Sequence, residues 1–194
     1  MMLENAHERP VPIERLEATG AIAKGHFRLS SGRHSDTYVQ CAMLLKDPRE
    51  AVEIGRALAE VVTGEFDLVL SPALGALLVG FTTALAAGCP MIFAERVEGV
   101  MRLRRGFEIP AGAGVLVVED VITTGGSALE LIAMVENAQA RVAGVACIIE
   151  RGTMDAGYPV YSLIRLDAES SAPDECPLCR EGRPIDSPGS RLLT

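Results

Sequence analysis

VLVVEDVITTGGSALE, residues 115–130, decides the fold because it joins a buried strand to a helix through a short polar turn. Val115–Val118 contains no polar residue, which is typical of a strand covered on both faces. Glu119 and Asp120 follow at the carboxyl end of that strand, where open parallel sheets bind their ligands. Thr123–Ser127 offers hydroxyl and backbone N–H groups with little bulk, so an anion can lie at the start of the following helix. The segment predicts a site for a sugar phosphate, with the two acids facing sugar hydroxyls or a divalent cation.

Other phosphate-binding motifs do not match this segment. A Walker A loop requires a lysine after its last glycine, but Gly126 is followed by Ser127. The G-x-G-x-x-G spacing of dinucleotide-binding proteins is also absent. The remaining alternative is an ordinary strand, turn and helix with acids at its edge.

Length and composition indicate one ordinary globular domain. The chain has 194 residues, of which 48% are hydrophobic and 23% charged. Its net charge of −8 argues against non-specific nucleic-acid binding, which needs a basic surface. A small anionic substrate must therefore be attracted by local basic groups.

Neither the N-terminus nor the longest uncharged run predicts a membrane segment. Residues 1–12 contain acids and no apolar centre, unlike a secretory signal. Residues 68–94 carry no charge, but Pro72, Gly88 and Pro90 divide them into strand, helix and strand. The five cysteines are scattered and odd in number, so a disulfide framework is not expected. We expect a cytoplasmic protein without a membrane partner.

Helix and strand patterns alternate along most of the chain, which predicts an α/β fold with a central parallel sheet and right-handed crossovers. Asp47 followed by Pro48 and Glu50 has the pattern of a helix start, with Glu50 reaching back to the cap. Residues 96–112 are charged and less regular, and residues 172–194 are proline-rich and should be loop-rich. The expected helices are 13–24, 48–62, 76–87 and 127–138. The expected strands are 26–29, 37–40, 67–71, 91–95, 115–118, 145–150 and 161–166.

The segment 115–130 resembles the phosphoribosyl pyrophosphate (PRPP) signature of the type I phosphoribosyltransferases. Three further segments resemble the orotate phosphoribosyltransferase branch: FRLSSGRHSDTYVQ (27–40), FAERVEGVMRLRRGFEI (93–109) and IIERG (148–152). The resemblance implies a type I phosphoribosyltransferase fold with helices flanking the sheet and a small hood. It also implies a single domain over residues 1–194, with the hood at about 13–45, the core at about 46–167 and an extension at about 168–194.

The resemblance assigns roles to individual residues. Residues of the signature, the preceding arginine and the loop SPALGA (71–76) are expected to bind PRPP: Arg96, Glu119, Asp120, Val121, Ile122, Thr123, Thr124, Gly125, Gly126, Ser127, Ala73, Leu74 and Gly75. The expected orotate contacts are Thr123, Arg151, Ser31 and Gly32, because arginine pairs with carboxylates through two parallel hydrogen bonds. The expected catalytic residues are Asp120, Arg102, Arg104 and Arg105. A strained or cis peptide is also implied in the loop 71–76.

The implied reaction is phosphoribosyl transfer from PRPP to orotate, giving orotidine 5′-monophosphate and pyrophosphate in pyrimidine synthesis. Mg²⁺ is the implied cofactor, carried by PRPP near Glu119 and Asp120. A homodimer is implied as well, with the loop 97–107 reaching the partner's site. Two alternatives remain open at this point. One is a purine phosphoribosyltransferase, and the other is a non-catalytic regulator that binds PRPP or a nucleotide and controls RNA.

The chain departs from well-known relatives at several basic positions. Ser30 stands where they have a lysine before the Ser-Gly-Arg turn, and Leu74 and Gly75 stand where they have a lysine in the pyrophosphate loop. Residues 97–101 contain no cation, whereas the relatives' loop has lysines and a histidine. Arg96 and the arginines at 102–105 are the candidates to replace these charges, and the sequence does not identify the loop catalyst.

Cys176 and Cys179 have the C-x-x-C spacing of half a structural zinc site. No second pair of this kind follows, so a complete site would require two half-sites that meet across a dimer. His26 and His34 are interpreted as structural or rim residues, not as general bases. Zinc is therefore not the expectation from sequence.

Overall fold

The computed structural model describes residues 13–29, 31–155, 157–168 and 170–188. Its main body is a six-stranded sheet in the order β5-β4-β3-β6-β7-β8. Five strands are parallel and β5 is antiparallel to β4 at one edge. The strands are β3 (Leu68–Pro72), β4 (Met91–Val97), β5 (Val100–Leu103), β6 (Gly114–Ile122), β7 (Arg141–Glu150) and β8 (Val160–Arg165). The predicted α/β class and parallel core are confirmed, and the sheet as a whole is mixed.

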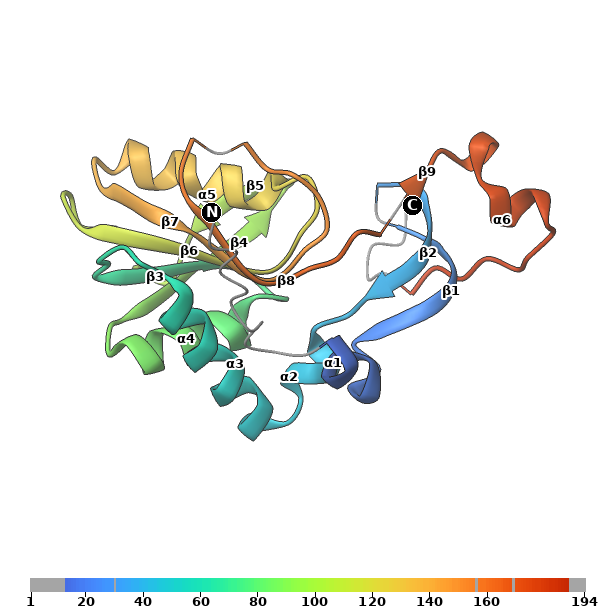
Figure 1. Cartoon of the computed structure of the whole chain (residues 1–194). Coiled ribbons are helices and arrows are strands. Elements are labelled where there is room, and N and C mark those ends of the chain that lie inside the picture. The colour runs from blue at the N-terminus through green and yellow to red at the C-terminus, as the bar shows by residue number, and fades with distance from the viewer. Residues whose placement is uncertain (1–12, 30, 156, 169, 189–194) are drawn as a thin grey trace, which may run out of the picture.

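Helices cover both faces of this sheet. Figure 1 shows α5 (Gly126–Asn137) on one face and α3 (Pro48–Val61) with α4 (Leu77–Ala87) on the other. Successive residues of β6 enter opposite halves of the core: Leu116 packs on the α3 and α4 side, whereas Val117 packs on the α5 side. This double burial explains why the strand lacks polar residues before Glu119.

The uncharged run at residues 68–94 folds as the predicted strand, helix and strand. α4 spans 11 residues and ends at Gly88, whose left-handed φ of 71° lets its N–H reach the last carbonyls of the helix. Among the described residues, no helix is long and apolar enough to cross a membrane.

The start of α3 follows the predicted pattern with one difference. Asp47 Oδ1 accepts a hydrogen bond from Arg49 N at 2.9 Å, and Pro48 occupies the first helical position. Glu50 does not reach back to the cap as predicted. It accepts a hydrogen bond from Arg15 Nε at 2.6 Å, because α1 (Ile13–Thr19) lies beside this turn.

Several boundaries differ from the prediction because strand pairing extends them. β6 runs to Ile122, so the two acids lie inside the strand, opposite the last residues of β7. The charged segment after residue 95 is partly regular: β4 turns back into β5, and Ala94 pairs with Leu103. β5 lies at the edge of the sheet and can carry charged residues on its open side, so an apolar run does not identify it in the sequence.

A second sheet forms the hood over the carboxyl ends of the parallel strands. It contains β1 (Ile22–Arg28), β2 (His34–Val39) and the short β9 (Ser170–Ser171) in the order β1-β2-β9. α1 and α2 (Ala42–Leu45) lie at its base (Figure 1). The tail adds the 3₁₀ turn Pro173–Glu175 and α6 (Pro177–Arg180) beside these strands, and its last six residues lie outside the described chain.

Helices α3 and α4 touch through a glycine. A Cβ atom built on Gly55 would lie 2.4 Å from the backbone carbonyl carbon of Thr82, closer than side chains tolerate. We therefore expect Gly55→Ala to lower the free energy of unfolding by about 1–3 kcal/mol, although alanine favours helices more than glycine does. Chemical denaturation measures this change. Arg56→Ala, on the exposed face of the same helix, is the control and should change stability by less than about 0.5 kcal/mol; an equally stable Gly55→Ala protein would contradict the packing argument.

Candidate active site

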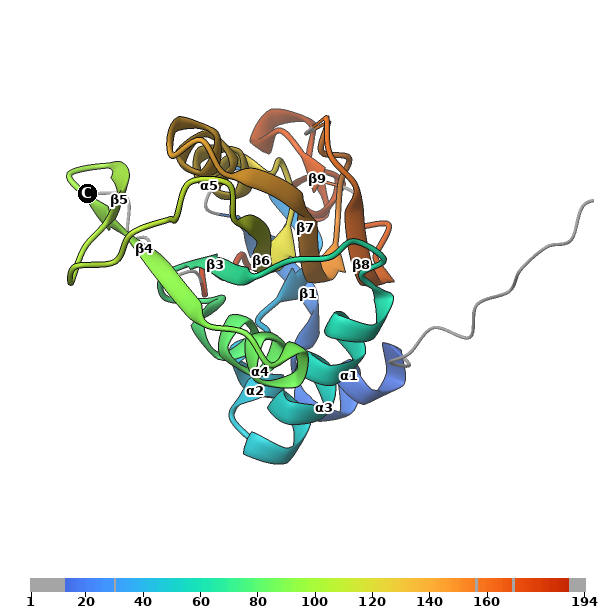
Figure 2. The same cartoon turned by 90° about the vertical axis from the view of Figure 1, so that its left-hand side faces the viewer.

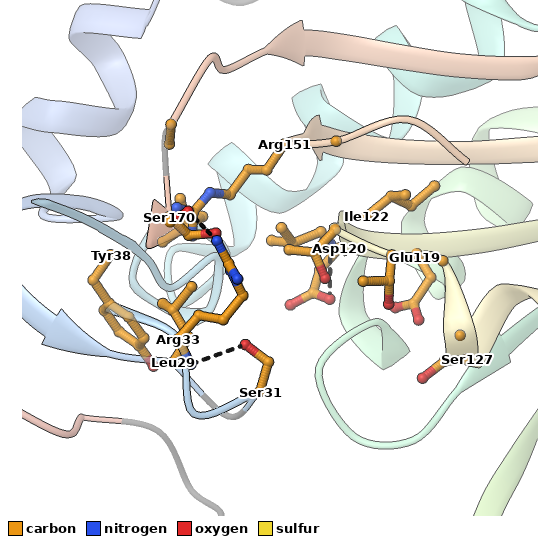
Figure 3. Close-up of a pocket in the computed structure, with 18 of the residues that line it drawn as sticks. Leu29, Ser31, Arg33, Tyr38, Glu119, Asp120, Ile122, Ser127, Arg151 and Ser170 are labelled. Carbon is orange, nitrogen blue, oxygen red and sulfur yellow. Dashed lines mark hydrogen bonds between the residues drawn. The ribbon is translucent and has the colours of Figure 1, made fainter. Parts of the chain in front are cut away.

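A cleft of about 1070 Å³ lies between the hood and the carboxyl ends of the parallel strands. Figure 3 shows that its lining side chains come from both parts of the chain. The hood and its connections contribute Leu29, Ser31, Arg33, Tyr38, Val39, Ala168 and Ser170. The core contributes Arg96, Gly99, residues 119–127, Glu130, Arg151 and Gly152. This position agrees with the rule that α/β sheets bind ligands beyond the carboxyl ends of their strands.

Two carboxyl groups meet on the core side of the cleft. Glu119 is 9% exposed, and burial together with the adjacent Asp120 raises the pKa of its carboxyl to about 8. Burial also raises the pKa of Asp120, although its Oδ1 accepts a hydrogen bond from Val121 N at 2.9 Å. The pair is therefore short of compensating positive charge. Ribose hydroxyls or a divalent cation would supply the missing partners.

The turn Thr123–Ser127 forms a cradle of main-chain groups at the start of α5. Gly125 precedes the helix with φ at 75°, a conformation that favours glycine. A Cβ atom on Gly125 would also lie 2.2 Å from Met154 Sδ, so a side chain here would require Met154 to move. The 12-residue α5 directs its free N–H groups and positive dipole end toward the cleft, as an anion such as phosphate requires.

The loop between β3 and α4 passes beside the acids. The peptide between Ala73 and Leu74 is cis, as the resemblance suggests. A Cβ atom on Gly75 would lie 2.9 Å from Asp120 Oδ2, which places this loop against the carboxyl group. Leu74 is 81% exposed. Residues 73–75, which were expected to bind PRPP, lie beside the cleft but are not among the residues that line it.

Arg151 follows the last residue of β7 and points toward the hood (Figure 3). Its N–H donates to Ile122 O at 2.8 Å, which ties it to the end of β6. Its Nη2 donates to Ser35 Oγ and to Thr37 O, each at 3.2 Å. Its Nε is buried and has no hydrogen-bond partner among the described residues. An unpaired guanidinium donor beside a cleft is suited to a ligand carboxylate.

The structure brings further residues to the cleft that the sequence did not single out. Arg33 Nε donates to Ser170 Oγ at 2.9 Å, and another nitrogen of Arg33 donates to the Ser170 carbonyl. Tyr38 lines the same side and packs on Phe27, with ring centroids 5.6 Å apart. Arg33 belongs to the Ser-Gly-Arg turn of the hood, so its position in that turn could have identified it as a site residue. Ser170 carries no local signal, because it reaches the site only through pairing of β9 with β2.

The expected hood contacts are only partly in the cleft. Ser31 lines it, whereas Gly32 does not and instead shapes the turn with φ at 79°. The turn closes through hydrogen bonds from Gly32 N to Leu29 O and from Leu29 N to Arg33 O. Ser30, one of the noted departures, lies outside the described residues.

Of the four predicted arginines of the charged segment, only Arg96 lines the cleft. Its Nη2 pairs with Glu130 Oε1 at 2.7 Å, and its Nη1 donates to Gly99 O. Arg105 instead pairs with Glu95 at 3.0 Å and lies over the ring of Phe93.

Arg102 lies on β5 of the β4–β5 hairpin, which extends from the sheet edge (Figure 2), and Arg104 follows the last residue of that strand. Neither they nor Arg105 are among the residues that line the cleft of their own chain.

Comparisons with known proteins agree with this architecture. Residues 40–156 match the phosphoribosyl transferase domain family. The orotate phosphoribosyltransferase of Caldicellulosiruptor bescii is 49% identical over 182 residues, covering 92% of this chain and 96% of that protein. The orotate phosphoribosyltransferase of Caldanaerobacter subterraneus subsp. tengcongensis is 46% identical over 189 residues, covering 96% of this chain and 100% of that protein.

A solved structure gives the same result. The orotate phosphoribosyltransferase of Mycobacterium tuberculosis in complex with Fe(III) dicitrate is 30% identical, with a TM-score of 0.63, and the match covers 79% of this chain and 97% of that one. The sheet order, the acidic strand end and the glycine-rich turn thus occur in a chain that is similar along nearly its whole length to these enzymes. The chain belongs to the phosphoribosyltransferase family, in its orotate phosphoribosyltransferase branch.

Proposed function

We propose that the cleft transfers the 5-phosphoribosyl group of PRPP to orotate, giving orotidine 5′-monophosphate and pyrophosphate in pyrimidine nucleotide synthesis. The observation that carries the substrate is Arg151, whose buried Nε has no partner among the described residues. Orotate is a planar base with a carboxylate, which a guanidinium binds through charge-assisted hydrogen bonds. Tyr38 and Leu29 offer apolar surface to the ring of the base.

The donor would lie on the core side of the cleft. Thr123–Ser127 would hold the 5′-phosphate with main-chain N–H and hydroxyl groups. Glu119 and Asp120 would accept hydrogen bonds from the ribose hydroxyls. The C1′–oxygen bond to pyrophosphate then breaks as the bond from orotate N1 to C1′ forms, and N1 releases its proton to solvent. The two carboxyl groups lie on the side where the ribose gains positive charge.

Mg²⁺ fits the residues present, because two buried carboxyl groups with raised pKa lie together where oxygen ligands are needed. Glu119 and Asp120 would hold it through the ribose hydroxyls or directly. When bound, the ion neutralises charge on the pyrophosphate. The loop at residues 73–75, which passes against Asp120, would face the diphosphate with its main chain.

The hairpin arginines support a homodimer as part of this proposal. Arg102 lies on β5 of the hairpin at the sheet edge (Figure 2), and Arg104 and Arg105 follow that strand. None of the three lines the cleft of their own chain, although Arg96 and Gly99 of the same hairpin do. In a dimer the loop 97–107 would cover the partner's cleft, exclude water and bring cations to the pyrophosphate. The protein would act in the cytoplasm on small molecules, without nucleic-acid or membrane partners.

The substrate class is tested by mixing protein, PRPP and Mg²⁺ with orotate, uracil, adenine or hypoxanthine in turn. We expect only orotate to be consumed, with one pyrophosphate released for each base, because only orotate carries the carboxylate that Arg151 requires. Chromatography of the bases and a pyrophosphate assay provide the two measurements. Consumption of adenine or hypoxanthine would instead support the purine alternative. Binding of PRPP without any turnover would support the regulator.

Arg151 is tested by substitution. We expect Arg151→Ala to raise KM for orotate about 10–100-fold, the equivalent of about 1.5–3 kcal/mol for a charged hydrogen bond, with little change in KM for PRPP. Arg151→Lys keeps the charge without the planar donor pair. Its KM for orotate should therefore lie between the values for the original protein and for Arg151→Ala. Arg165→Ala, on the neighbouring strand and exposed, is the matched control. An unchanged KM for orotate in Arg151→Ala would refute the assigned role.

The raised pKa of Glu119 predicts a pH-dependent stability. The folded protein holds this proton up to about pH 8, whereas the unfolded chain releases it near the ordinary value of 4.5. The folded state then binds more protons, so the free energy of unfolding falls as the pH rises between these values. Glu119→Gln cannot ionise and should remove about 2–4 kcal/mol of that fall.

Urea denaturation of the free protein at pH 5, 6.5, 8 and 9 measures this effect. The stability of Glu119→Gln relative to the original protein should improve steadily from pH 5 to pH 8 and then level off. Glu60→Gln, an exposed substitution on α3, serves as the control. Parallel pH profiles for the original protein and Glu119→Gln would show that this carboxyl group ionises normally.

A further inference from the structure

Four side chains meet in the hood at a distance from the acidic pair. His26 lies on β1, His34 begins β2, Cys176 caps the start of α6 and Cys179 lies within that helix. One ligand atom from each lies within 4.8 Å of all the others. The two histidines and Cys176 are buried, and Cys179 is exposed. The C-x-x-C pair therefore finds its missing partners in its own chain, which corrects the expectation that a second half-site would have to come from a dimer.

We propose that His26, His34, Cys176 and Cys179 bind one structural Zn²⁺ ion that fastens the C-terminal segment to the hood. Two thiolates and two imidazoles are a ligand set that zinc takes in closed tetrahedral sites. The spacing of Cys176 and Cys179 is that of a zinc-binding pair.

Four of the six distances between the ligand atoms agree with the edges of a tetrahedron, and the remaining two are at most 4.8 Å. Nitrogen and sulfur atoms placed about 2.0–2.3 Å from a central ion lie about 3.3–3.8 Å from one another. His26 Nε2 lies 3.3 Å from His34 Nδ1, 3.5 Å from Cys176 Sγ and 3.7 Å from Cys179 Sγ. Cys179 Sγ lies 3.3 Å from His34 Nδ1. Each of these four edges falls within the expected range.

Hydrogen bonding alone does not account for this cluster. His26 Nδ1 lies 3.0 Å from the carbonyl oxygen of Arg183, which only accepts, so Nδ1 carries the proton. In the neutral ring, Nε2 then presents a single lone pair to three neighbours: His34, Cys176 and Cys179. A central cation uses that lone pair and the neighbouring ones together. A backbone carbonyl that orients the other nitrogen is the usual support of a histidine ligand.

The hood has little apolar packing of its own to hold it to the C-terminal segment. Among the described residues, neither of the two main hydrophobic clusters has a member from 23–38 or from 167–188. A sheet of two long strands and a two-residue third strand has little stability of its own. The tail is otherwise joined to β1 by backbone hydrogen bonds, from Arg28 N to Asp186 O and from Asp186 N to His26 O. A metal ion would supply the stability that buried apolar area does not.

The proposed zinc site supports the base side of the cleft. His34 pairs with Ser171 across β2 and β9, next to Ser170. Arg33, the neighbour of His34, donates to Ser170. The ligand His34 thus adjoins Arg33 of the cleft lining in sequence and pairs with Ser171, the neighbour of Ser170. None of the four proposed ligands belongs to that lining.

The test uses the full-length protein purified without chelator and dialysed against metal-free buffer. Elemental analysis should find about one zinc per chain. Protein loaded with Co²⁺ should show the visible absorption of a tetrahedral site and a near-ultraviolet thiolate-to-metal band, a signature that magnesium sites lack. A strong chelator should lower Tm by at least about 5 °C. These measurements do not involve catalysis, so their failure would leave the proposed reaction untouched.

Matched variants separate the site from a general effect of cysteine loss. Cys179→Ser changes the most exposed ligand and should fold, yet lose the zinc, the cobalt bands and the response to chelator. Cys89→Ser, a partly exposed cysteine beyond α4, should keep all three. The proposal fails if the original protein retains no zinc, if Cys179→Ser retains it fully, or if thiol titration with mass analysis finds Cys176 and Cys179 joined as a disulfide.

Discussion

Burial of both faces of the parallel sheet is the constraint on which the rest of this structure depends. Helices on each side leave β6 no contact with water along most of its length, so its early positions must be apolar. Polar chemistry is then confined to the end of the strand. Glu119, Asp120 and the cradle at Thr123–Ser127 lie together because the strand ends and the helix begins at the same edge of the sheet.

The hood imposes a different requirement on the same cleft. It supplies Arg33, Tyr38 and Ser170, yet it draws little stability from apolar packing. Its order comes from strand pairing, from hydrogen bonds to the tail and, in our proposal, from a metal ion. The core side can thus be built from local sequence, whereas the hood depends on segments well over a hundred residues apart.

Predictions succeeded where a feature depends on nearby residues and failed where it depends on distant ones. The strand, turn and helix at 115–130 and the cap at Asp47 were predictable, because each depends on neighbours within a few residues. Strand β5, which pairs with the predicted strand β4, was not expected, since it has only four residues and lies in a charged segment. The pairing of Glu50 with Arg15 was missed because an acid near a helix start can bond to the cap of its own helix. Only the position of α1 directs Glu50 to Arg15 instead.

The sequence alone determined the α/β class, the acidic strand end and the glycine-rich anion turn, because strand burial and turn conformation are set by residue type over short distances. Tertiary structure alone decided that Arg151 keeps an unpaired buried donor beside the cleft and that Ser170 lies beside Arg33. It also decided that Cys176 and Cys179 meet two histidines some 150 residues earlier in the chain. No local pattern encodes such a meeting, since it exists only once distant strands have paired.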